Sequence, residues 1–396
     1  MSETSLQRFY ADLHIHIGRT EKGEPVKISG SRNLTFAQIA SEASDRKGID
    51  LIGIIDCHSP GVQTDIKNSL DKGDMEEIEE GGISYGRTTI LMGSEIEIRE
   101  PGMGPAHLLV FFPHLYMMEE FTGWLSKRMK NVGLSSQRLH APALTLQEEV
   151  TARGGMLIPA HIFTPHKSIY GSAAPRMADV LDLSQVSAVE LGLSADSEMA
   201  GYLSELDEFT ILTNSDAHSL GKIGREYNEM ALQKPNYREF EKALARTDGR
   251  RVTANYGLNP RLGKYHRTYC SGCQSIIDEQ GIAVQRCSYC GSTKLTRGVL
   301  DRILSIADRE APLVPDHRPP YHYQVPLEFI PGLGKAKLGL LLDAFGTEMN
   351  ILHRVPTQEL TKVVGTELST AIGEARSGTM QLIAGGGGTY GKVQKV

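Results

Sequence analysis

The sequence predicts an α/β fold in which a barrel of about seven strands occupies residues 1–255, followed by a small cysteine-rich unit and a helical region. Two observations predict the barrel. Short apolar runs rich in β-branched residues alternate with segments of helical spacing, and His, Asp and Glu residues recur at or just past the ends of those runs. In a barrel the carboxyl ends of the strands converge on one mouth, whereas an open sheet would gather fewer such residues at one point.

The apolar runs have the length and composition of buried strands. Between them, the segment 36–48 has the spacing of a helix that stops at Gly48, and the segment 118–133 that of a helix that stops at Gly133. Strand and helix are therefore expected to alternate along the barrel. The runs are LHIHI (13–17), LIGII (51–55), TILMGSEIEI (89–98), HLLVFF (107–112), MLIPAHIF (156–163), AVELGL (188–193) and TILTNSDAH (210–218).

The bulk composition is that of a globular protein of two or three domains, with 396 residues, 40% hydrophobic and 23% charged. The start of the chain has no apolar core of signal-peptide length, and no apolar run is long enough to span a membrane. We therefore expect a cytoplasmic protein.

Charge is unevenly placed along the chain, although the net charge is −6. The stretch 246–297 holds nine basic and three acidic residues. A basic zone of this kind could contact a polyanion such as DNA. A solvated basic surface would explain the charge equally well.

Residues that bind divalent metals occur as pairs near strand ends. Residues two apart in a strand point the same way, so His14 and His16 offer two imidazoles on one face. A lone buried His is often an ordinary core residue, but three such pairs with further carboxylate and imidazole groups predict a metal centre. The candidate ligands are His14, His16, Asp56, His58, Glu95, His107, His161, Asp216 and His218.

A centre of imidazole and carboxylate ligands holds divalent ions and leaves open positions for water. Clustered ions activate a water and neutralise charge on a phosphoryl group, which makes phosphoester hydrolysis the leading reaction class. The candidate catalytic residues are Asp216, His218 and Glu95, and Asp216 is the first candidate for orienting or deprotonating the water.

The ordered motifs DLHIHI, IIDCHSP, GSEIEI, PAH and NSDAH, over roughly residues 9–230, resemble those of the polymerase-and-histidinol-phosphatase (PHP) superfamily. The resemblance implies a distorted (β/α)7 barrel of PHP type with two or three divalent ions, Zn²⁺, Mn²⁺ or Mg²⁺. It implies one site of His14, His16, Glu95 and Asp216, a second of Glu95, His107 and His161, and a third of His58 and His218.

Two departures from the superfamily pattern affect the third metal site. Cys57 separates Asp56 from His58, where the superfamily has Asp directly followed by His. The further His or Asp expected soon after the H-x-H pair is missing from the segment 18–27. Cys57 or Asp56 could replace a ligand, and Cys57 could equally be a small buried core residue.

Four cysteines form two C-x-x-C pairs separated by thirteen residues, the spacing of a zinc ribbon over residues 256–298 that holds one structural Zn²⁺. The preceding basic stretch interleaves Arg and Lys with Tyr256, Tyr265 and Tyr269, which suits phosphate contact and base stacking. A purely structural ribbon is the alternative. The cysteines are Cys270, Cys273, Cys287 and Cys290.

The helical region, 299–396, contains the segment IPGLGKAKLGLLLDAFG, which resembles a helix-hairpin-helix. Its two glycines permit a tight turn at a helix N-terminus that can grip a phosphate, and a degenerate second half surrounds Gly365. A small dimerisation unit is the alternative, and the Gly-rich tail could be a flexible tail or an ordered loop near the active site. The candidate DNA-binding residues are Arg250, Arg251, Lys264, Gly332, Gly334, Lys335 and Lys337.

The order of barrel, four-Cys ribbon and helix-hairpin-helix, together with FTPHKSIYG (163–171), ELGLSAD (190–196) and IGREYN (223–228), resembles the endonuclease Q family over nearly the whole chain. The resemblance implies nicking of duplex DNA on the 5′ side of deaminated bases, namely hypoxanthine, uracil and xanthine, or of abasic sites. The damaged nucleotide would be extruded into a pocket, for which 18–33 and 164–176 are the candidate loops.

Two other function classes stay open from the sequence. A small-molecule phosphatase on the same barrel, similar to histidinol phosphate phosphatase, would give no reason for the two C-terminal modules. A non-catalytic DNA-binding scaffold would give no reason for the nearly complete set of metal ligands.

Overall fold

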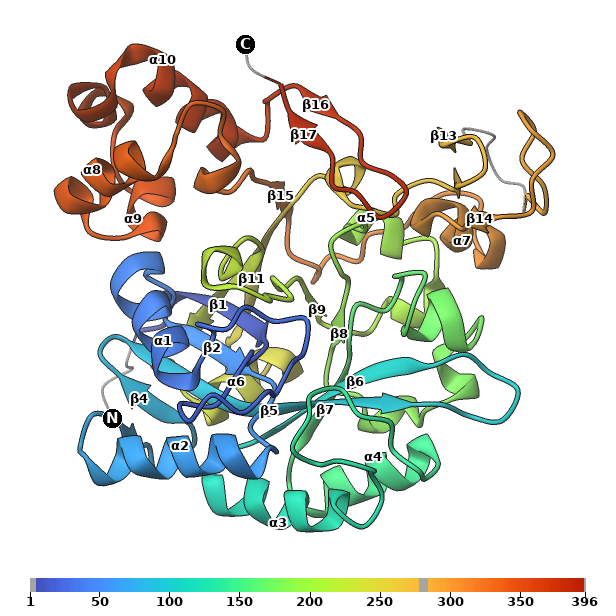
Figure 1. Cartoon of the computed structure of the whole chain (residues 1–396), viewed down its shortest axis with the longest axis horizontal. Coiled ribbons are helices and arrows are strands. Elements are labelled where there is room, and N and C mark those ends of the chain that lie inside the picture. The colour runs from blue at the N-terminus through green and yellow to red at the C-terminus, as the bar shows by residue number, and fades with distance from the viewer. Residues whose placement is uncertain (1–4, 278–283, 395–396) are drawn as a thin grey trace.

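A computed structural model describes residues 5–277 and 284–394 of the chain (Figure 1). At its centre lie seven strands, one for each apolar run of the sequence. These strands are β1 (Gln7–Ile15), β2 (Leu51–Ile54), β5 (Thr88–Ile98), β6 (Ala106–Phe112), β7 (Met156–Pro159), β8 (Val189–Glu190) and β9 (Ile211–Leu212). β2 pairs in parallel with both β1 and β5, and β8 pairs in parallel with β9.

Backbone hydrogen bonds close these strands into a ring. Ser187 N donates to Leu157 O at 2.9 Å and joins β7 to the approach to β8. Ala217 N donates to His14 O at 3.1 Å and joins the chain that follows β9 to β1. The predicted α/β barrel is thereby confirmed.

The expected alternation of strand and helix is wrong between β5 and β6. These two strands form an antiparallel hairpin joined by a short loop, and β7 is in turn antiparallel to β6. The hairpin register places Glu97 opposite His107. The reversed strand distorts the barrel and delivers His107 to the end of the ring that carries Glu95.

One of the two predicted helix ends is confirmed. α1 (Phe36–Ser41) continues as a π-helical turn (Glu42–Lys47) and ends at Gly48, whose φ of 76° is a left-handed value that glycine adopts readily. The second helix, α3 (Leu115–Leu125), ends earlier than predicted because the chain then turns back toward the barrel mouth, where Ser59 Oγ donates to Gly133 O at 3.1 Å. The other helices of the barrel region are α2 (Pro60–Asp71), α4 (Ala143–Ala152), α5 (Ser197–Ala200) and α6 (Tyr237–Ala245).

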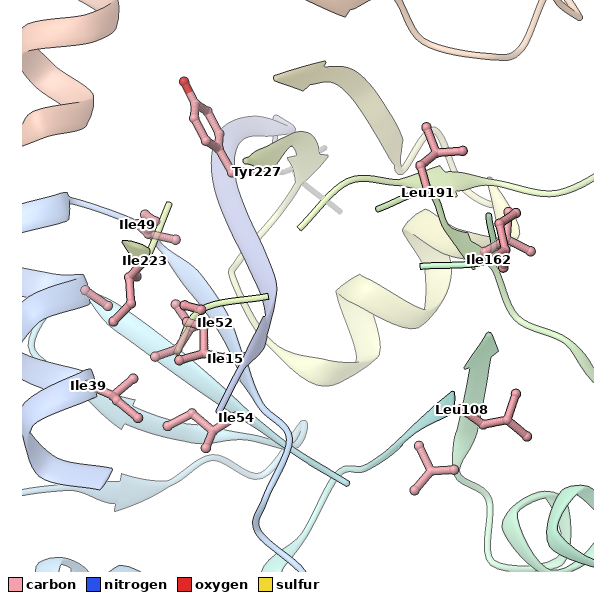
Figure 2. Close-up of a cluster of buried hydrophobic side chains, with 14 of the residues drawn as sticks. Ile15, Ile39, Ile49, Ile52, Ile54, Leu108, Ile162, Leu191, Ile223 and Tyr227 are labelled. Atoms are coloured by element: carbon pink, nitrogen blue, oxygen red, sulfur yellow. The ribbon is translucent and has the colours of Figure 1, made fainter. Parts of the chain in front are cut away.

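The core has two faces because side chains alternate along each strand. On β6, Leu109 and Phe111 enter one buried cluster, whereas Leu108 and Val110 enter the other. Figure 2 shows the cluster that contains Leu108. In it, Ile15, Ile52 and Ile54 of the strands face Ile39 of α1. Each fully buried side chain of this size contributes about 1.5–3 kcal/mol.

Further strands widen the sheet on both sides of the ring. β10 and then β11 extend it from β1, and β4 and β3 extend it from β5. After the cysteine-rich unit the chain returns to the barrel, since β15 pairs in parallel with β11. These strands are β3 (Glu76–Glu77), β4 (Ile83–Tyr85), β10 (Tyr227–Leu232), β11 (Arg251–Gly257) and β15 (Tyr321–Tyr323).

The cysteine-rich unit and the C-terminal helices lie on the same side of the barrel, opposite α2, α3 and α4 (Figure 1). We propose the division into 1–255, 256–298 and 299–396, with the qualification that β15 belongs to the barrel sheet. The elements of the two smaller units are β12 (Tyr269–Cys270), β13 (Ser275–Ile276), β14 (Leu295–Thr296), α7 (Val299–Ile306), α8 (Lys335–Phe345), α9 (Glu348–His353), α10 (Thr357–Ser377), β16 (Leu382–Ile383) and β17 (Lys392–Val393).

A buried ion pair fixes the C-terminal helices on the barrel. Lys47 Nζ lies 3.0 Å from Glu348 Oε2 of α9, and their side chains are only 4% and 7% exposed. α10 is interrupted at Gly365, whose φ of 79° breaks it into two helices. In the part of the chain that the structure describes, no helix combines the length and the apolar character needed to cross a membrane.

Candidate metal centre and nucleic-acid interface

Seven of the nine predicted metal ligands meet at the mouth of the barrel. They form three overlapping groups, and within each group the potential ligand atoms lie within 4.8 Å of one another. The groups are His14, His16 and Glu95; Glu95, His107 and His161; and His16, Asp216 and His218.

The strands explain this convergence. His14 and His16 lie at the end of β1, and Glu95 lies on β5, which β2 separates from β1, close to its hairpin with β6. His161 and Asp216 follow β7 and β9 with φ values of 33° and 45°. Positive φ is uncommon for residues other than glycine and is found frequently at functional sites.

Glu95 is the central carboxylate of the cluster. Its Oε1 lies 2.7 Å from His107 Nδ1, 3.4 Å from His161 Nε2 and 3.5 Å from His14 Nε2. Burial raises the pKa of Glu95, but the charges of His107 and Lys27 outweigh burial and hold the pKa well below its usual range. Glu95 is therefore ionised and can be shared between two cation positions.

Two further carboxylates orient the H-x-H pair. His14 Nδ1 lies 3.0 Å from both oxygens of Glu190, and His16 Nδ1 lies 3.1 Å from Asp56 Oδ2. Each imidazole therefore turns its Nε2 toward the cluster, as in the carboxylate–histidine–metal arrangement of many metal sites. Glu190 was not a predicted site residue, although a carboxylate inside the apolar run of the sixth strand was a signal for it.

Buried polar atoms in the cluster fit a bound cation. Within the described residues, His14 Nε2 and both ring nitrogens of His107 are buried without a well-directed hydrogen bond. Such atoms are rare in native proteins unless another partner satisfies them. Imidazole and carboxylate donors in this number suit divalent ions such as Zn²⁺ or Mn²⁺.

Among the described residues, the groups of potential ligands do not include His58 and Asp56, the other two predicted metal ligands. His58 is fully buried, with Nδ1 2.7 Å from Ser94 Oγ and Nε2 3.3 Å from Leu134 O. Asp56 uses Oδ2 for His16 and for the backbone N–H of Ile17 at 2.7 Å. Burial raises the pKa of the Cys57 thiol, so Cys57 is a neutral core residue.

The four predicted zinc cysteines come together in the small unit. Their Sγ atoms lie within 4.8 Å of one another, and the pairs Cys270/Cys290 and Cys273/Cys287 are each 3.6 Å apart. A backbone N–H of Cys273 lowers the pKa of Cys270 to about 6, which favours the thiolate that binds zinc. The geometry fits one four-thiolate Zn²⁺ site.

The structure places two of the predicted DNA contacts, Arg250 and Arg251, away from the metal ligands. Arg250 is buried and paired with Glu239, with Nε 3.0 Å from Oε2. Arg251 lies at the start of β11, level with the first residues of β1 and therefore at the end of the sheet opposite the metal ligands. Asp278 and Glu279, counted in the basic stretch, lie outside the described residues.

The remaining DNA-binding candidates are accessible. Lys264 lies at the mouth, with Nζ 4.6 Å from the centroid of the Tyr390 ring. Gly332, Gly334, Lys335 and Lys337 are all exposed around the first turn of α8. Gly332 has a φ of 84°, which supplies the predicted tight turn before the helix.

A pocket opens beside the metal ligands. Its lining includes the proposed ligands His161 and Asp216 together with Lys264, Tyr265 and Tyr390. Of the two loops expected to form a pocket, 164–176 contributes Thr164, and Gly192, Leu193 and Ser194 complete the lining.

Tyr390 comes from the Gly-rich tail, which is ordered against the barrel mouth. Its hydroxyl accepts a hydrogen bond from Arg225 Nη1 at 3.1 Å, and Arg225 Nε donates to Ser215 O at 2.7 Å. Gly391 N donates to Leu262 O at 2.9 Å and ties the tail to the segment that leads into the cysteine unit. Of the two alternatives for this tail, the structure therefore agrees with an ordered loop near the site, although the sequence did not single out Tyr390.

No protein-family model matches the chain. The uncharacterized protein YqxK of Bacillus subtilis is 49% identical over 391 residues, which are 98% of this chain and 100% of that protein. The uncharacterized protein MJ0043 of Methanocaldococcus jannaschii is 33% identical over 253 residues, which are 58% of this chain and 31% of that protein.

Two solved structures match nearly the whole chain. The lesion-specific endonuclease PfuEndoQ of Pyrococcus furiosus superposes with a TM-score of 0.85 at 30% identity, covering 98% of this chain and 95% of that chain. Endonuclease Q in complex with a 27-mer duplex substrate, with an abasic lesion at the active site, gives a TM-score of 0.84 at 30% identity and covers 98% and 97%.

The first prediction concerns Glu190. Glu190→Gln should weaken binding of divalent ions to the barrel by about 10- to 100-fold, because the carboxylate that orients His14 and raises its basicity is lost. Titration of the metal-free protein with Mn²⁺, followed by calorimetry, measures the change. Glu241→Gln on the surface of α6 is the matched control, and equal affinities in the two variants would contradict the role of Glu190.

The second prediction concerns the four-thiolate site. Cys287→Ser should release the structural Zn²⁺ and destabilise the unit around β12–β14 while the barrel keeps its metal ions, because the two sites share no ligand. Elemental analysis of the purified variant tests this. Zinc content equal to that of the unsubstituted chain would refute the assignment.

Proposed function

Since this chain belongs to the endonuclease Q family, we propose that it is a metal-dependent DNA repair endonuclease that hydrolyses a phosphodiester bond next to a damaged nucleotide. The observation that carries the proposal is the buried cluster of imidazoles and carboxylates with an aromatic pocket directly beside it. In the solved complex of endonuclease Q, a duplex substrate has an abasic lesion at the active site. This complex supports the proposal that damaged DNA binds at the barrel mouth of this chain.

Our finer proposal is that the bond cleaved lies on the 5′ side of hypoxanthine, uracil, xanthine or an abasic site. The resemblance of the ordered motifs to the endonuclease Q family supports it. A nucleotide inside a duplex cannot reach a buried centre unless it leaves the base stack. The pocket lies beside Asp216, and Tyr265 and Tyr390 in its lining offer ring faces for stacking.

The exposure of the site residues supports their proposed roles. When bound, divalent ions at this cluster would supply an activated water and neutralise charge on the phosphoryl group. The Asp216 side chain is 33% exposed, whereas that of Glu95 is 1% exposed. Asp216 can thus orient the attacking water. Glu95 is a fixed buried ligand, and His218, which is 34% exposed, can contact the phosphate.

The electrostatics of Asp216 agree with this role. Burial raises its pKa, but the neighbouring imidazoles of His14, His218 and His16 outweigh burial and lower it strongly. The carboxylate is therefore ionised in the free protein. Its Oδ1 lies 3.5 Å from His14 Nε2 and 3.6 Å from His16 Nε2, which keeps it directed into the cluster.

Duplex binding away from the lesion is assigned to the start of α8. Free N–H groups at a helix N-terminus attract phosphate, and here the exposed Lys335 and Lys337 add two positive charges. Lys264 at the mouth can contact the phosphates that flank the flipped nucleotide. These contacts would carry no sequence information, which suits an enzyme that must scan undamaged DNA.

The third prediction tests the proposed reaction directly. With Mn²⁺, the protein should nick labelled duplexes that contain one abasic site, uracil or hypoxanthine, and should leave undamaged duplex and simple phosphomonoesters intact. Asp216→Asn should lower the nicking rate by orders of magnitude without unfolding the chain, since a ligand and its charge are lost. Hydrolysis of phosphomonoesters alone would favour the small-molecule phosphatase, and DNA binding without any cleavage would favour the scaffold.

The fourth prediction concerns the grip on the duplex. The double variant Lys335→Glu/Lys337→Glu should bind damaged and undamaged duplex more weakly by the same factor, because phosphate contacts do not read sequence. The slope of log K against log salt should flatten by roughly 0.9 for each lost contact. Fluorescence anisotropy at several salt concentrations measures both effects.

The charge-matched control for that variant is Arg238→Glu/Arg251→Glu. Both arginines are exposed, and Arg251 lies at the end of the sheet opposite the metal ligands. If the two double variants bind DNA equally well, the start of α8 is not a phosphate contact.

A further inference from the structure

The third metal position expected for a PHP barrel lacks its ligands in this chain. His58 Nε2 donates to Leu134 O, His58 Nδ1 is hydrogen-bonded to Ser94 Oγ, and Asp56 supports His16. Among the described residues, no group of three potential ligand side chains includes either residue. His218 is grouped only with His16 and Asp216, which already belong to the first position.

The ammonium group of Lys27 lies beside the metal ligands, on the side where the third ion is expected. Lys27 Nζ lies 3.3 Å from Glu95 Oε2 and 2.6 Å from Ser136 Oγ. The Lys27 side chain is 15% exposed, so most of it is buried with its charge directed at the carboxylates.

The backbone holds Lys27 in this place. Lys27 N donates to Ile17 O at 2.9 Å, directly after the H-x-H pair, and Gly30 N closes a turn onto Lys27 O at 2.9 Å. Gly30 packs so closely on Gly18 that a Cβ at residue 30 would lie 2.9 Å from Gly18 Cα. The turn is therefore fixed to the end of β1, and the position of Lys27 does not depend on the carboxylates alone.

Two serines complete the lining of this position. Ser136 has a φ of 53°, and its hydroxyl contacts both Glu95 Oε2 and Lys27 Nζ. Ser135 Oγ lies 3.1 Å from His16 Nδ1 and 3.0 Å from Ser136 Oγ. Hydroxyls and an ammonium are poor ligands for a divalent ion, and the positive charge repels one.

We infer that the Lys27 ammonium takes the place of a third divalent ion, so that the barrel of this protein holds two divalent ions and one fixed lysine charge. Lys27, Ser136 and Lys167 also line an open cavity at the mouth. This inference rests on the proposed function in one respect, namely that the ammonium donates a hydrogen bond to a phosphate oxygen of the DNA strand while Glu95 and Ser136 hold its other hydrogens.

The number of bound metal ions tests the inference without reference to activity. After saturation with Mn²⁺ and removal of the excess, the full chain should hold two Mn²⁺ in addition to the Zn²⁺ of the four cysteines. Lys27→Asp should hold one Mn²⁺ more, because a ligand replaces the charge that excludes the ion. Lys67→Met on the outer helix α2 is the control and should leave the count at two.

Three barrel ions in the unsubstituted chain would overturn the inference, as would a folded Lys27→Asp variant with no additional ion. If Lys27→Asp does not fold, as judged by circular dichroism, the number of Mn²⁺ ions bound to the unsubstituted chain still decides whether the inference holds. These counts do not depend on DNA, so they separate failure of this inference from failure of the proposed nuclease function.

The phosphate contact has its own readout. Lys27→Met should lower kcat for nicking about 100-fold, as expected for loss of one donor to the reacting group, while KM and the count of two Mn²⁺ stay close to their original values. Lys27→Arg, which keeps the charge, should recover part of kcat. A rise in KM at constant kcat would show that Lys27 serves binding of DNA and not the reacting phosphate.

Discussion

A buried carboxylate that has to stay ionised, Glu95, constrains the whole mouth of the barrel. A carboxylate moved from water into an apolar interior without partners would take up a proton. Glu95 avoids this because imidazoles from β1, β6 and the loop after β7 surround it, and Lys27 approaches it from a separate turn. Each of these groups comes from a different segment of the chain, so the ring has to close correctly before the charge is compensated.

The antiparallel hairpin of β5 and β6 brings one of these imidazoles, that of His107, to Glu95. In a regular βαβ unit the next strand would begin far from the mouth, and a residue at its start would lie at the wrong end. The direct connection reverses β6, so that His107, near its start, lies beside Glu95. Around this centre Glu190 and Asp56 fix the two imidazoles of β1, so the orientation of the ligands is set by hydrogen bonds and is not left to side-chain freedom.

The sequence predicted those parts of the site that depend on strand periodicity. His14 and His16 share a face because residues two apart in a strand always do. The same spacing does not place Asp56 and His58 in the groups of potential ligands, because these residues follow β2 in a turn, where period two does not hold. Arg250 failed for another reason: a local count of charges cannot detect that Glu239, eleven residues earlier, neutralises it. Lys27 and Tyr390 are missed because their roles arise from contacts between segments far apart in the chain.

The last of these long-range contacts ties the accessory modules to the chemistry. The tail that carries Tyr390 packs against residues 261–264, at the start of the cysteine unit, through backbone hydrogen bonds of Gly385 and Gly391. Arg225 connects the hydroxyl of Tyr390 to the carbonyl oxygens of Ser215 and Asp216. Asp216 has a left-handed backbone that costs free energy of order 1–3 kcal/mol and persists only where its surroundings hold it. The geometry of a predicted metal ligand therefore depends on the far end of the chain, which explains in physical terms why barrel, cysteine unit and tail form one site.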